Sequence, residues 1–301
     1  MSEHYPRIRT PWKRCPGLAV REGLSLTFYT RCTHRELGPR ALRALEVYRR
    51  AIGPGALAWY GDDEREDWLE LDERGWEVSR RKLLEGRHNS LELMDELEGQ
   101  GQFQFNYHGR WMEDPLGISP EGLVSALSFR LSTEYLEAHG PRQVQRLALA
   151  LARELPFDSG YAGLCFHAGE ELGVPEAVAV HLPRYPGIAL DDVSRTAMYL
   201  GTRVEGVYWM NFLGAPVLGE LGGVEVLRAK LTSPGVIIEP LGEQRACVIL
   251  GEWPEAGDTE QGRTLPAYRE LARVLEPWLY HRPLSPYSKE SILRWERRFL
   301  D

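Results

Sequence analysis

The sequence predicts an α+β fold in which a mixed, partly antiparallel sheet is flanked by helices. Short apolar stretches typical of strands alternate with longer stretches whose apolar residues recur at helical spacing. Two strand-like stretches, "SLELMDEL" and "FQFNYHG", are joined by the turn-rich "EGQGQ" and predict an antiparallel hairpin. This mixture along one chain favours the α+β class over a purely parallel sheet. With 301 residues, 43% of them apolar, the chain can bury a substantial core.

The first half of the chain contains two predicted helices. Gly38 and Pro39 open the first, because proline suits the first helical position. Asp72 can cap the second, because its carboxylate can accept backbone N–H groups at a helix start. The elements expected here are a strand at 24–30, a helix at 38–52, a strand at 56–60, a helix around 73–85 and a hairpin near 90–108.

The second half repeats the order of strand and helix. Gly-Pro-Arg opens the helices at 38–52 and 140–155 alike, which suggests two pseudo-repeated β-α-β modules. Ser288 is placed to cap the last helix. The elements expected here are strands at 125–132, 161–166 and 206–212, helices at 140–155, 173–183, 216–231 and 265–280, a strand pair at 235–252 and a C-terminal helix.

No linker divides the chain cleanly, so one main domain is expected. We expect an N-terminal arm at 1–20, a single α+β domain at 21–285 with sub-modules 21–115 and 120–285, and a C-terminal helix at 286–301. Neither a secretory signal nor an apolar run long enough for a membrane span is present. The four cysteines form no C-x-x-C pair. These features predict a cytoplasmic protein without a membrane partner.

Acidic charge is concentrated in one segment. Residues 62–73 hold eight acidic residues and one arginine, while the whole chain has a net charge of −8. Such a surface disfavours nucleic acid and favours a basic protein partner. Charge runs are often solvated faces, but aromatic residues are interleaved with this one and could anchor a protein interface. The candidate partner-binding residues are Trp59, Tyr60, Asp62, Asp63, Glu64, Glu66, Asp67, Trp68 and Glu70.

The glycine-rich stretch 209–223, "WMNFLGAPVLGELGG", resembles a phosphate-binding loop only in its spacing. Gly214 and Gly219 match the P-loop interval, but Glu220 and Leu221 follow where lysine and a hydroxyl residue are needed. Close packing of a helix on a sheet explains the glycines better. No cofactor is predicted from this stretch.

His167 and Glu170 suggest an alternative function. They follow a predicted strand in "CFHAGEELG" and could belong to a hydrolase or a metal-dependent enzyme. No second histidine or cysteine stands at ligand spacing, and no H-E-x-x-H motif is present. A histidine at a strand end is more often a hydrogen-bonded structural residue. No catalytic residue and no metal ligand is therefore predicted.

Four longer blocks of the sequence resemble the type VI immunity family. They are residues 131–166, 184–190, 206–223 and 257–280, and the resemblance extends over most of residues 20–285. It implies a cytoplasmic antitoxin that binds and neutralises an effector of type VI secretion, such as a VRR-NUC nuclease, by covering the active site of the toxin. Members of this family are not known as enzymes, which agrees with the absence of a catalytic motif. The resemblance supplies no contact residue.

Overall fold

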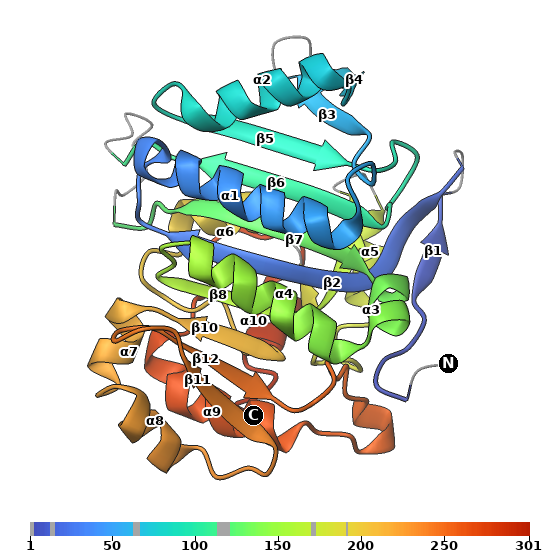
Figure 1. The fold of residues 1–301 in the computed structure, drawn as a ribbon. Coiled ribbons are helices and arrows are strands. Elements are labelled where there is room, and N and C mark those ends of the chain that lie inside the picture. Colours follow the sequence, from blue (N-terminus) through green and yellow to red (C-terminus); the bar gives the residue numbers. More distant parts are fainter. Residues whose placement is uncertain (1–2, 13–15, 63–66, 113–120, 170–172, 191) are drawn as a thin grey trace.

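The computed structural model describes residues 3–12, 16–62, 67–112, 121–169, 173–190 and 192–301, and they build one large sheet (Figure 1). Its strands run in the order β11-β12-β10-β8-β2-β7-β6-β5-β3-β4, with β1 beside β2 and β9 beside β8. All described pairs are antiparallel except β8 with β9. The strands are β1 (Arg9–Pro11), β2 (Leu18–Thr30), β3 (Trp59–Asp62), β4 (Asp67–Glu70), β5 (Asn89–Met94), β6 (Phe103–Gly109), β7 (Ser125–Ser132), β8 (Ser159–Ala168), β9 (Ala189–Leu190), β10 (Met210–Leu213), β11 (Val236–Pro240) and β12 (Ala246–Leu250).

Helices lie on both sides of this sheet, which confirms the predicted α+β class. They are α1 (His34–Ile52), α2 (Glu73–Leu84), α3 (Thr133–His139), α4 (Pro141–Glu154), α5 (Val174–Ala179), α6 (Val193–Tyr199), α7 (Ala215–Glu220), α8 (Val224–Lys230), α9 (Pro266–Leu275) and α10 (Lys289–Glu296), with short 3-10 turns at Thr259–Gln261 and Glu276–Trp278. No helix in the described ranges is both long and apolar enough to cross a membrane.

One face of the sheet is apolar and covered by helices. Side chains alternate between the two faces of a strand, and the apolar set from β2, β5, β6 and β7 points to the side of α1 to α4. Tyr48 of α1, for example, packs edge-on against Phe129, with ring centroids 5.3 Å apart. In Figure 1, α1 and α4 cross this face side by side, and α2 covers its end above β5.

The other face is covered only in part. α5 packs on β2 and β8, and α6 packs on β7. The chain before α10 is attached here by a buried ion pair, since Arg282 Nη2 lies 2.6 Å from Glu205 Oε1 and both side chains are 2% exposed. Tyr29 of β2 donates to the same carboxylate at 2.7 Å. In the described ranges, no helix packs on the half of this face formed by β3 to β6.

Most of the predicted elements are present. The hairpin near 90–108 is β5 and β6, and the strand at 125–132 is β7. Asp72 accepts from the Gly75 N–H at 2.8 Å, and Ser288 accepts from Ser291 N–H at 3.1 Å, so both predicted caps are confirmed.

Three local predictions are wrong. The helix α1 starts at His34, so Pro39 lies inside it, whereas Pro141 opens α4, and the two Gly-Pro-Arg segments are not equivalent. The helix expected at 216–231 is broken into α7 and α8, because Gly222 and Gly223 adopt φ values of 91° and 89°. The strand expected at 206–212 is confined to Met210–Leu213.

Contact between α1 and α2 depends on one glycine. A Cβ on Gly38 would lie 1.9 Å from the Leu83 carbonyl oxygen, so only glycine allows the two helices to approach this closely. We expect Gly38→Ala to lower the free energy of unfolding by roughly 1–3 kcal/mol in urea titrations. Gly219→Ala in α7 is the matched control, because nothing lies within 4 Å of that position. Equal stability of the two variants would contradict this account of the packing.

Candidate functional site

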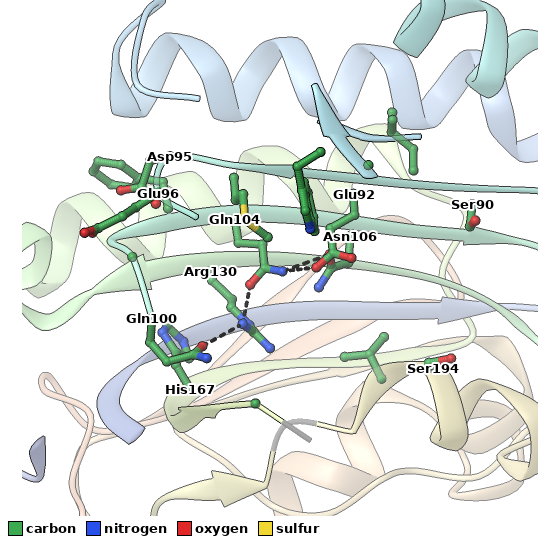
Figure 2. Close-up of a pocket in the computed structure, with 18 of the residues that line it drawn as sticks. Ser90, Glu92, Asp95, Glu96, Gln100, Gln104, Asn106, Arg130, His167 and Ser194 are labelled. Carbon is green, nitrogen blue, oxygen red and sulfur yellow. Dashed lines mark hydrogen bonds between the residues drawn. The ribbon is translucent and has the colours of Figure 1, made fainter. Parts of the chain in front are cut away.

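The uncovered half of the sheet face forms the floor of an open cleft of about 650 Å³ (Figure 2). The loop between β5 and β6 and the β3–β4 hairpin contribute to its lining on one side. The end of β8 and the start of α6 contribute on the other side. The cleft therefore lies where coverage of the second face by helices stops.

The floor consists of polar residues from three adjacent strands. Register places Glu92 of β5 opposite Asn106 of β6, and Gln104 of β6 opposite Arg130 of β7. The Arg130 guanidinium donates to the amide oxygen of Gln104, and the Gln104 amide nitrogen donates to Glu92. Figure 2 shows these side chains gathered over the strands. This network links a cationic group on the floor to an anionic one through a neutral amide.

Acidic side chains outnumber basic side chains in the lining of the cleft. Six carboxylates and one arginine are found among the described residues that line it. The pKa of His108 is lowered to about 4, mainly by burial and to a smaller extent by repulsion from the charge of Arg110. Burial also holds the pKa of His167 well below its usual range. Both histidines are therefore neutral near pH 7 and do not offset the negative charge. The carboxylates are Asp62, Asp67, Glu92, Asp95, Glu96 and Asp192.

Three of the residues predicted from the acidic segment line this cleft. They are Asp62 at the end of β3, with Asp67 and Trp68 at the start of β4. Asp62 and Asp67 face each other across the hairpin as register partners. Asp63, Glu64 and Glu66 lie outside the described residues.

The other three predicted residues have different positions. Tyr60 is only 6% exposed and packs against Gly75 of α2, so its side chain belongs to the core. Glu70 lines a separate hollow between the hairpin and α2. Trp59 is half-buried opposite Met94 of β5.

Sequence reasoning missed the part of the cleft that β5, β6 and β7 supply. Glu92, Gln104, Asn106 and Arg130 are the polar members of strands whose alternate residues are buried. That alternation was visible in the sequence and indicated a hairpin. It could not indicate that none of the helices described in the structure covers this part of the second face.

His167 lines the base of the cleft but is held as a structural residue. Its exposure is 1%, and its Nε2 lies 3.1 Å from the Leu24 carbonyl oxygen. A Cβ on Gly23 would lie 2.2 Å from the imidazole, which shows how tightly the ring is enclosed. Glu170, its suggested partner, lies outside the described residues. Within the described ranges, no three His, Cys, Asp or Glu side chains are grouped so that they could hold a metal ion.

In the glycine-rich stretch 209–223, the predicted close packing of a helix on the sheet through its glycines is wrong for Gly219 and Gly223, since nothing lies within 4 Å of a Cβ placed on either. The start of the stretch is fixed by hydrogen bonds. Asn211 is fully buried, and its side chain accepts from the Tyr208 N–H at 2.9 Å and donates to the Tyr208 carbonyl at 2.7 Å. Trp209 donates its indole N–H to the Gly251 carbonyl at 3.0 Å. These bonds fix the chain just before and within β10, which explains why the regular strand is shorter than predicted.

Comparison with known proteins gives a family and a fold. The chain matches the family model described as "TsiV: Type VI immunity for VRR-NUC" over residues 40–299. A solved structure, the Pseudomonas aeruginosa T6SS protein PA0821, has a similar fold, with a TM-score of 0.77 and 21% sequence identity. That similarity covers 97% of this chain and 87% of the other. Among curated proteins, none matches. Since the family model spans nearly the whole chain, the protein belongs to the TsiV family of type VI immunity proteins for VRR-NUC effectors.

Proposed function

We propose that this immunity protein inhibits its nuclease by placing the acidic cleft and the β3–β4 hairpin over the active site of the toxin. The observation that carries the proposal is the excess of carboxylates around an uncovered sheet face. A nuclease binds DNA through clustered lysine and arginine side chains, because these neutralise phosphates. Carboxylates on a fixed sheet can occupy the positions of those phosphates and exclude the DNA.

The electrostatics of the cleft also suit rapid recognition. Opposite charges on two proteins accelerate their encounter, and a fast encounter limits the time in which a free nuclease can cut DNA. The same negative field repels nucleic acid, so we propose a basic protein partner and no nucleic-acid partner. The location that this role requires is the cytoplasm, where the DNA to be protected lies.

We propose that the protein itself catalyses no reaction. The alternative enzyme would use His167 and Glu170. The His167 imidazole nitrogen Nε2 is engaged by a main-chain carbonyl of β2, and its pKa is lowered by burial and by the charges of Arg130 and Arg21. This arrangement supports a structural role for His167, which links β8 to β2 through this hydrogen bond.

The charge of the cleft can be tested with three conservative substitutions. We expect Asp62→Asn, Asp67→Asn and Glu96→Gln together to weaken binding to a catalytically inactive cognate toxin by roughly 100-fold, since each removes a charge facing a basic surface. Isothermal titration calorimetry at two salt concentrations would measure this loss of affinity. The affinity of the variant should also depend less on salt than the affinity of the natural protein.

The control for this variant removes the same number of charges elsewhere. Glu225, Glu243 and Glu290 are exposed residues outside the cleft, and their change to glutamine should leave the affinity unchanged. If both triple variants bind as tightly as the natural protein, the acidic cleft is not the binding surface. Survival of cells that express the active toxin gives the matching readout of protection.

A substitution at His167 separates the inhibitor from the enzyme. We expect His167→Gln to keep full toxin binding and full protection of cells at equal protein levels, because the imidazole lies beneath the cleft surface. Protein levels and thermal unfolding are measured in parallel, since a buried side chain is changed. A folded variant that binds the toxin but no longer protects cells would favour the catalytic alternative.

A further inference from the structure

We propose that the cleft holds one arginine side chain of the toxin, stacked on the indole ring of Trp68 with its guanidinium against Glu92. This inference rests on the proposed function and names the group that anchors the complex. It follows from the geometry of three neighbouring strands, β5, β3 and β4, at the hairpin end of the cleft.

A row of three residues crosses these strands on the uncovered face. Gly61 of β3 pairs with Trp68 of β4. The register of β3 with β5 joins Trp59 to Met94 and Tyr60 to Leu93, so the next position brings Gly61 beside Glu92. A Cβ on Gly61 would lie 3.8 Å from two atoms of the Trp68 six-membered ring and 4.0 Å from Glu92 Cβ. Because Gly61 has no side chain, nothing from that position fills the space between the ring and the carboxylate.

Hydrogen bonds fix both sides of this space. Glu92 accepts from the Gln104 amide, and turning the Asn106 amide so that its nitrogen faces Glu92 provides a second donor at 3.2 Å. On the hairpin, Lys82 of α2 donates to the Gly61 carbonyl at 3.0 Å, which fixes β3 against the helix. The carboxylate and the β3 backbone at Gly61 are therefore positioned before the partner arrives, which reduces the entropy lost on binding.

The chemistry of this space selects a guanidinium. A planar guanidinium stacks on an indole face and can bind a carboxylate through two parallel N–H donors, whereas an ammonium cannot combine both contacts as well. The protein already contains such stacks, with Arg49 lying 3.7 Å from the Trp76 ring centroid and Arg298 lying 3.7 Å from that of Trp295. Asp62 and Asp67 near the same end of the cleft add charge that attracts a cation.

A larger side chain at Gly61 tests the proposed arginine site and leaves both Trp68 and Glu92 in place. We expect Gly61→Val to weaken binding to the inactive toxin at least tenfold, because valine is well accepted in a strand but occupies the place of the guanidinium. Trp68→Ala and Glu92→Gln should each cost about tenfold, and Trp68→Phe less than Trp68→Ala. The double variant Trp68→Ala with Glu92→Gln should lose less than the product of the single losses, since both residues contact one group. Circular dichroism confirms that each variant is folded.

Chemical footprinting identifies the toxin residue. Phenylglyoxal labelling with mass spectrometry should show one toxin arginine that is protected in the natural complex and reactive in the Gly61→Val complex. The absence of any toxin arginine with this pattern would overturn the proposal. The proposal would also be overturned if Gly61→Val and Trp68→Ala bind with the affinity of the natural protein while the Asp62, Asp67 and Glu96 triple variant binds weakly. That result would reject the arginine anchor but not the occlusion of the toxin by the cleft. Natural affinity in all of these variants would reject both the anchor and the acidic cleft.

Discussion

Side chains of a strand point alternately to the two faces of a sheet, and the properties of this protein depend on that constraint in β5, β6 and β7. One set of alternate residues is apolar and fills the core beneath α1 and α2. The other set includes Glu92, Gln104, Asn106 and Arg130, and it becomes the cleft floor. A polar residue moved by one position would leave the cleft and enter the core, so the floor and the core are specified together.

A buried polar group around Glu205 attaches the chain before α10 to the second face of the sheet. Burial would lower the pKa of Arg282, but the Glu205 carboxylate raises it above its usual range, so the guanidinium stays charged within the protein. Breaking such a pair would leave one buried charge without compensation, which is strongly destabilising. The pair therefore holds the C-terminal part of the chain on the β2 and β8 half of the face.

Local signals in the sequence predicted most elements, because caps and periodicity act over a few residues. Asp72 and Ser288 show this, since each bonds to a residue only three positions away. The break at Gly222 and Gly223 was missed because the apolar pattern continued through it, although two adjacent glycines permit the positive φ values that end a helix. The sequence predicted an acidic binding surface but not a cleft. The acidic segment indicated Asp62, Asp67 and Trp68, but the cleft also needs Glu92 and Arg130, which only strand pairing brings beside them.

The β3–β4 hairpin lies at the end of the sheet, with β4 paired to β3 alone among the described strands. Exposed residues of a peripheral hairpin make few contacts with the core, so many substitutions there leave folding intact. If this hairpin contacts the toxin as proposed, its place at the margin of a rigid scaffold allows specificity to evolve separately from the architecture that supports it.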